Sequence, residues 1–116
     1  MKRAMVRYRV RADQAPANER YIKGVFEQLA ERQPSGLRYA SFKLDDGVSF
    51  VHIVSQETTD GSNPLTELPA FKAFTAAIAE RCEEPPVVEK LTEVGSYKMF
   101  GGWPDEGAGS GSPTGR

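Results

Sequence analysis

A β-hairpin is predicted by residues 37–56, which read LRYASFKLDDGVSFVHIVSQ. Apolar and polar residues alternate on both sides of the central Asp-Asp-Gly, as they do in strands with one buried face. An Asp-Gly pair favours a tight turn, because these residues tolerate the positive φ angles that such a turn needs. If Asp46 and Gly47 form a two-residue loop, Ser41 lies opposite His52. A three-residue loop would shift this register, so the sequence leaves both registers open.

Helical and strand patterns flank this hairpin on both sides. Strict alternation predicts a first strand, and apolar residues at helical spacing predict one helix before the hairpin and one after it. Pro85 and Pro86 are expected to end the second helix, because neither can donate a helical hydrogen bond. Apolar residues that fall out of alternation predict a bulge near Gly95. The expected elements are strand 5–11, helix 16–32, strands 37–44 and 48–56, a loop over 57–64, helix 69–84 and strand 87–99.

The order of these elements, β-α-β-β-α-β, predicts an α+β, ferredoxin-like fold. In that fold a four-stranded antiparallel sheet carries both helices on one face, and the other face stays uncovered. Apolar side chains there cannot all be left in water, so we expect a second copy of the sheet to cover them and form a dimeric α+β barrel. The residues expected on this face are Arg7, Arg9, Tyr39, Ser41, Lys43, Phe50, His52 and Val54.

The chain has 116 residues and a mass of 12.8 kDa, which fits one domain. We assign that domain to residues 1–100. Residues 101–116 are rich in Gly, Ser and Pro and carry Trp103 as their only large apolar side chain, so we expect a disordered tail. The basic start has no apolar run behind it, and no stretch is long enough to span a membrane, so a cytoplasmic protein is expected.

The charges are unevenly distributed along the chain. Residues 1–43 hold ten Lys and Arg against four acidic residues, a net charge of +6, whereas residues 44–116 hold five against twelve, a net charge of −7. We expect these two halves to attract each other. An isoelectric point near 5.9 and the lack of a basic stripe argue against nucleic-acid binding.

His52 is the sole histidine and the only side chain with an ordinary pKa near neutrality, so it is the candidate catalytic acid or base. The alternative is that His52 forms hydrogen bonds across a polar dimer seam. Tyr39 could donate a hydrogen bond to a substrate oxygen, and Phe50 would line the same site. No metal is expected, because one His without a carboxylate partner and the single Cys82 do not make a ligand set. Cys82 is expected on the buried side of the second helix.

Arg7 and Arg9 are candidate substrate-binding residues on the same strand. A guanidinium offers a planar fork of donors that can hold a carboxylate or an enolate. The alternative is a solvated or interface row of arginines that pairs with acids of the later half of the chain, such as Glu57, Glu89 or Glu93.

Four stretches together resemble a known group of proteins. They read VRYRV at 6–10, GVSFVHIV at 47–54, NPL at 63–65 and LPAFKAF at 68–74. Over residues 3–98 the chain resembles small single-domain members of the dimeric α+β barrel superfamily, in particular those grouped with antibiotic biosynthesis monooxygenases.

This resemblance implies a homodimer that acts without a cofactor, as a monooxygenase or isomerase of a small aromatic or enolisable molecule. Haem is not expected, because the second helix lacks a ligand histidine and Trp103 lies in the tail. Some oxygenase relatives use an asparagine, but Asn63 stands beside Pro64 and is expected to cap a turn. The alternative function is a non-catalytic homodimer that binds a small metabolite or a protein partner.

Overall fold

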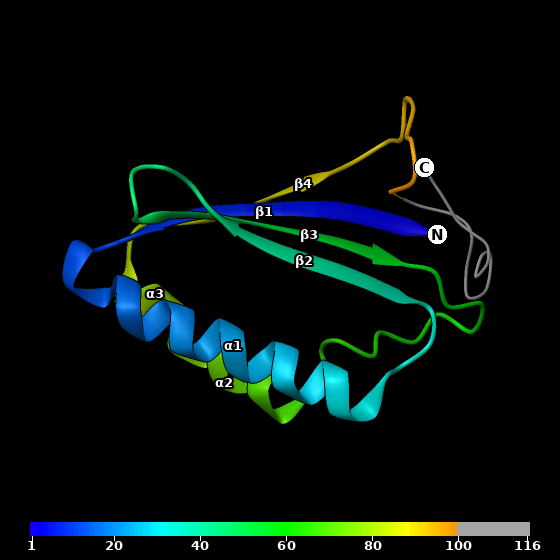
Figure 1. Cartoon of the computed structure of the whole chain (residues 1–116), viewed down its shortest axis with the longest axis horizontal. Coiled ribbons are helices and arrows are strands. Elements are labelled where there is room, and N and C mark those ends of the chain that lie inside the picture. The colour runs from blue at the N-terminus through cyan, green and yellow to red at the C-terminus, as the bar shows by residue number, and fades with distance from the viewer. Residues whose placement is uncertain (100–116) are drawn as a thin grey trace.

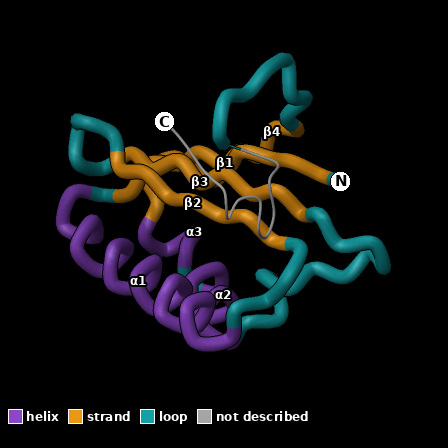
Figure 2. Tube along the Cα trace, turned by 45° about the vertical axis from the view of Figure 1, so that its right-hand side comes forward, coloured by secondary structure: helices purple, strands orange, loops and turns teal. Residues whose placement is uncertain are grey.

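One antiparallel sheet with the strand order β2-β3-β1-β4 forms the centre of the molecule. The computed structural model describes residues 1–99, and the predicted α+β, ferredoxin-like layout is confirmed. Figure 1 and Figure 2 show α1, α2 and α3 on one side of the sheet. Within residues 1–99, no helix is long and apolar enough to cross a membrane. The elements are β1 (Lys2–Val10), η1 (Ala12–Gln14), α1 (Ala15–Arg32), β2 (Leu37–Lys43), β3 (Ser49–Gln56), α2 (Pro69–Ala76), α3 (Ile78–Arg81) and β4 (Cys82–Lys90).

The hairpin between β2 and β3 has the register that a two-residue loop predicts, with Ser41 paired to His52. The Leu44 N–H donates to the Ser49 carbonyl at 2.9 Å, and the Gly47 N–H donates to the Leu44 carbonyl at 3.0 Å. Gly47 has a φ angle of +77°, where a side chain would be strained. The turn therefore determines which residues of β2 and β3 share a face.

The pairing of β1 with β3 corrects the predicted faces of the sheet. Because His52 pairs with Val6, the neighbouring Arg7 points to the opposite face. His52 lies on the face that the helices cover, so the expected dimer contact through this residue is wrong. Six residues predicted for the open face lie on the covered face instead, and these are Tyr39, Ser41, Lys43, Phe50, His52 and Val54.

The hydrophobic core lies between the sheet and the helices. Helical spacing turns Ile22, Val25 and Leu29 of α1 toward the sheet, as predicted, and Val25 is fully buried. Burial of a large apolar side chain contributes about 1.5–3 kcal/mol, so this core holds the covered face of the strands in place. The buried apolar residues are Tyr8, Val10, Val25, Leu37, Phe50, Leu65, Leu68 and Phe74.

The second helical region is shorter than predicted. Helix α3 is followed directly by β4, which begins at Cys82 and contains Pro85 and Pro86. Because β4 is an edge strand, a proline there removes no hydrogen bond that the sheet needs. The predictions that Cys82 lies on the helix, that the prolines end it and that the last strand spans 87–99 are therefore wrong.

The predicted bulge near Gly95 is also wrong, because Gly95 lies beyond the end of β4. The pairing of β1 with β4 shifts instead between Arg7 and Arg9, beside the two prolines. The expected tail over 101–116, with Trp103, lies outside the described residues, and so does the proposed domain boundary at residue 100.

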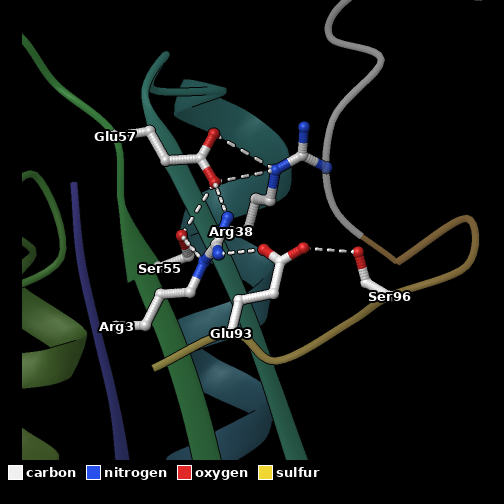
Figure 3. A network of polar contacts seen from close by, with 6 residues as sticks. All are labelled: Arg3, Arg38, Ser55, Glu57, Glu93 and Ser96. Carbon is white, nitrogen blue, oxygen red and sulfur yellow. Dashed lines mark hydrogen bonds and ion pairs between the residues drawn. The ribbon is translucent and has the colours of Figure 1, made fainter. Parts of the chain in front are cut away.

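A cluster of charged side chains joins β1, β2 and the segment after β4 (Figure 3). Glu57 accepts hydrogen bonds from Ser55 Oγ at 2.7 Å and from Arg38 Nε at 3.1 Å. Arg3 lies 3.5 Å from the same carboxylate and also donates to Glu93. Although burial opposes ionisation, the bonds from Ser55 and Arg38 hold the pKa of Glu57 below its usual range. The expected attraction between the basic and acidic halves therefore occurs here through Arg3 and Arg38. The predicted row of arginines also contributes, because Arg9 pairs with acids of β4.

Candidate functional site

Three strands bring one histidine, two tyrosines and a serine together beneath the helices. The Tyr8 hydroxyl lies 2.8 Å from Nε2 of His52. On the other side of the ring, Nδ1 lies 2.8 Å from the Tyr39 hydroxyl and 2.7 Å from Ser41 Oγ. The register explains this arrangement, because Ser41 pairs with His52 and Tyr39 lies two residues away on the same face of β2.

Asn18 of α1 and Arg81 of α3 extend this group of side chains. Asn18 Nδ2 donates to the Tyr8 hydroxyl at 2.8 Å, and Arg81 Nε donates to Asn18 Oδ1 at 3.0 Å. Arg81 is buried, its Nη1 has no hydrogen-bond partner, and its guanidinium carbon lies 4.4 Å from the centre of the Tyr21 ring. The ring face offsets part of the cost of burying this cation. We call the connected set the buried network, and it comprises Tyr8, Asn18, Tyr39, Ser41, His52 and Arg81.

The hydrogen bonds of the buried network indicate which nitrogen of the imidazole carries the proton. Because Arg81 donates to Asn18 Oδ1, the amide nitrogen of Asn18 faces Tyr8. The Tyr8 oxygen accepts that N–H and keeps its own proton for Nε2 of His52. We infer that Nε2 is the acceptor and that Nδ1 carries the ring proton, which points to the hydroxyls of β2.

Burial keeps the imidazole uncharged at neutral pH. His52 is 3% exposed, and its ring lies 5.3 Å from the Tyr8 ring and 5.4 Å from the Phe74 ring, between centroids. Loss of solvation lowers the pKa of His52 to about 4. The same cause raises the pKa of Tyr39 to about 12 and raises that of Tyr8. The buried network can therefore relay protons through a neutral imidazole, whereas it holds no cationic histidine acid near pH 7.

A hollow of about 690 Å³, which we call the large hollow, wraps around the edge strand β2. Tyr39 forms part of its wall, and its ring stacks against Phe26 at 5.3 Å between centroids. Arg38 and Ser55 add polar groups to the wall. A second hollow of about 140 Å³, the small hollow, is lined in part by Ser41. The apolar lining of the large hollow includes Phe26, Leu29, Leu37, Ala40, Phe42 and Ile53.

The structure brings three of the predicted site residues together and separates the other two from them. His52, Tyr39 and Phe50 lie on the covered face, where Phe50 also lines the small hollow. Arg7 and Arg9 lie on the open face, and Arg9 Nη2 donates to a carboxylate of β4 at 2.9 Å. The prediction that Arg7 and Arg9 lie beside His52 is therefore wrong.

The sequence patterns did not single out Asn18 and Arg81, although both occupy apolar stripes. Asn18 precedes Ile22 by four residues in α1, so it lies in line with a residue that packs against the core, and Arg81 is the last residue of α3, at the helical spacing from Phe74 that one continuous helix would give. Both are buried. A polar residue at a buried position of a helical stripe is the signal that could have identified them.

Asn63 lies in the loop between β3 and α2, and its side-chain oxygen does not cap the following turn. Oδ1 is buried and has no hydrogen-bond partner, whereas Thr66 Oγ1 donates to the Asn63 carbonyl at 3.1 Å. The capping prediction is therefore wrong, and this oxygen is available to a donor of a bound molecule or of water. Among residues 1–99, no group of three or more His, Cys, Asp and Glu side chains could hold a metal ion.

Comparison with known proteins identifies the class of fold. No protein-family model matches the sequence, and no curated protein matches it. The solved structures that match include proteins described as antibiotic biosynthesis monooxygenases and one described as a cofactor-independent oxygenase, and the resemblance seen in the sequence is confirmed for the fold. At sequence identities of 14–18%, this likeness establishes the fold alone.

Three of these structures show the extent of the likeness. Rv0793 from Mycobacterium tuberculosis has a TM-score of 0.67 and 18% identity, over 82% of this chain and 96% of that chain. A protein described as an antibiotic biosynthesis monooxygenase has a TM-score of 0.67 and 14% identity, over 82% of this chain and 100% of that chain. SnoaB from Streptomyces nogalater, described as a cofactor-independent oxygenase and solved as an asparagine-to-alanine variant, has a TM-score of 0.62 and 18% identity, over 84% of this chain and 97% of that chain.

Proposed function

We propose that this chain is a cofactor-independent oxygenase that acts on a small, flat phenolic or enolisable aromatic molecule. The observation that carries the proposal is the line of hydrogen bonds from Tyr39, at the wall of the large hollow, through His52 to Tyr8. SnoaB, which shares the fold, is described as a cofactor-independent oxygenase, and this supports the reaction class.

The large hollow suits a flat apolar substrate. Its volume of about 690 Å³ lies within the range of small-molecule sites. Phe26, Leu29 and Leu37 offer apolar surface to a ring beside Tyr39, and we assign the Tyr39 hydroxyl to contact with a substrate oxygen. We assign Tyr39 as the residue that contacts the substrate and His52 as the group that receives the proton from Tyr39.

Proton removal is the step that these residues can supply. A phenol reacts slowly with O₂ until it loses its proton, because the anion gives up electrons more readily. A phenol and O₂ together yield a quinone and water, so the substrate can supply all the electrons of this reaction. An uncharged imidazole near neutral pH is in the state that accepts a proton.

The open face of the sheet suits a second copy of this chain. Phe42 and Val87 are 51% and 54% exposed on this face. Val51 and Ile53 lie on the same face next to Phe42, and Arg7 lies between Val51 and Val87. Monomeric proteins rarely leave a continuous apolar patch uncovered. We therefore propose a homodimer that covers this face. If Arg7 binds an anion, it does so at this interface and not at His52.

The experiment is oxygen uptake by the purified protein with a panel of flat phenols in the presence of a metal chelator. We expect uptake that depends on the phenol, a quinone product that carries ¹⁸O from ¹⁸O₂, and phenol binding at about 10–100 μM. Binding without any uptake across the panel would favour the alternative, a non-catalytic homodimer that binds a small metabolite. Uptake that the chelator abolishes would contradict a cofactor-free reaction.

A further inference from the structure

Two hydroxyls share one nitrogen of the His52 ring. Tyr39 Oη lies 2.8 Å from Nδ1, and Ser41 Oγ lies 2.7 Å from the same atom. A ring nitrogen has either one proton to donate or one lone pair to accept with. Tyr39 and Ser41 therefore compete for Nδ1, and a proton on this nitrogen can pass to either side.

The two hydroxyls lead to different hollows. Tyr39 lines the large hollow, whereas Ser41 lines the small hollow together with Glu19 and Lys43. Lys43 Nζ and a Glu19 carboxylate oxygen are 2.9 Å apart, and these side chains are 46% and 39% exposed. A hollow beside an exposed ion pair is open to water, so Ser41 lies between water and a buried ring.

We propose that Ser41 is the point at which the ring proton of His52 exchanges with solvent, so that protons taken up in the large hollow leave through the small one. The direction of proton transfer in this inference rests on the proposed function, whereas the exchange of the Nδ1 proton with water does not depend on any reaction.

The transfer balances without a charged histidine. Nδ1 first gives its proton to Ser41, Ser41 gives its own proton to a water in the small hollow, and Tyr8 gives its proton to Nε2. Tyr39 then gives its proton to the lone pair now free on Nδ1 and takes the proton of the substrate hydroxyl, while Nε2 returns its proton to Tyr8. The substrate has lost one proton, the water has gained one, and His52 keeps the tautomer that Tyr8 and Asn18 favour.

The single histidine makes a direct test possible, because the chain has one imidazole signal to follow. The rate at which the Nδ1 proton exchanges with water is measured by NMR saturation transfer on ¹⁵N-labelled protein without substrate. Removal of the hydroxyl in Ser41→Ala should slow this exchange by at least about tenfold. Ser41→Thr keeps a hydroxyl at the position and should restore the wild-type rate.

Tyr39→Phe is the matched control, because it removes the competing hydroxyl on the other side of the same nitrogen. We expect its exchange rate to stay within about twofold of the wild-type rate. Exchange in Ser41→Ala at the wild-type rate would overturn the proposal, and so would equal slowing in Tyr39→Phe. If no phenol is oxidised but Ser41→Ala slows exchange as expected, the proposed function fails and the solvent connection through Ser41 stands.

Discussion

The hydroxyl of Tyr8 lies 2.8 Å from Nε2 of His52, and both side chains are buried between the sheet and the helices. In Tyr8→Phe, the Asn18 amide and the His52 ring would both lose their partner inside the core. An unpaired buried polar group costs about 1–3 kcal/mol of unfolding free energy. We expect the melting temperature to fall by at least about 4 °C. Tyr97→Phe is the matched control, because Tyr97 is 79% exposed, and a change of equal size there would contradict this account.

The low pKa of His52 predicts a loss of stability in mild acid. Because its pKa is about 4 in the folded chain and about 6.5 when unfolded, the unfolded state binds more protons between these values. The contribution of the neutral His52 to the free energy of unfolding is fully present above about pH 6.5 and is lost as the pH falls toward 4. The loss is roughly 2 kcal/mol between pH 7 and pH 5. Urea unfolding at a series of pH values measures this loss. An imidazole that titrates near pH 6.5 in the folded protein, by NMR, would contradict the buried placement.

Cys82 should react slowly with thiol reagents at neutral pH, although it lies in β4 and not on a helix. Burial raises the pKa of its thiol, so little reactive thiolate is present. The measurement compares labelling of the native protein with labelling in urea, where the thiol is fully accessible. Equal rates in the two conditions would show that Cys82 is not protected by the fold.

A charge at the centre of the open face should separate the proposed homodimer. Ile53 belongs to the central strand β3 and points away from the helices, so Ile53→Lys places an ammonium in the interface without touching the core. Light scattering should give about twice 12.8 kDa for the wild-type chain and about 12.8 kDa for the variant. Glu31→Lys, on the exposed side of α1, is the control and should remain dimeric. A wild-type chain that scatters as a monomer would contradict the dimer.

The hairpin could be predicted from the sequence, whereas the register of its strands against β1 could not. The Asp46-Gly47 turn fixes the register of β2 on β3 locally, and Ser41 pairs with His52 as predicted. No turn joins β1 to β3, since α1 and β2 come between them in the chain. The alternation of β1 therefore shows that Val6 and Arg7 face opposite ways but not which of them shares a face with His52.

The same reason limits what the sequence shows about the site. The hairpin pattern correctly predicts that His52, Tyr39 and Phe50 share a face. It does not show the register of β1 against β3, and for this reason Arg7 was assigned to the wrong face. The last strand was misplaced because Pro85 and Pro86 fit the end of a helix as well as an edge strand, and only the strand order distinguishes these cases.

The most direct test of the central claim is the kcat for oxygen consumption of Tyr39→Phe, with the phenol that the wild-type protein oxidises best. The substitution keeps the ring at the wall of the large hollow and removes only the hydroxyl that connects a substrate to His52. We expect a kcat at least about 100-fold below that of the wild type, as for the loss of a proton-transfer group, while Tyr97→Phe keeps the wild-type value. A Tyr39→Phe variant that consumes oxygen at the wild-type rate would contradict the account.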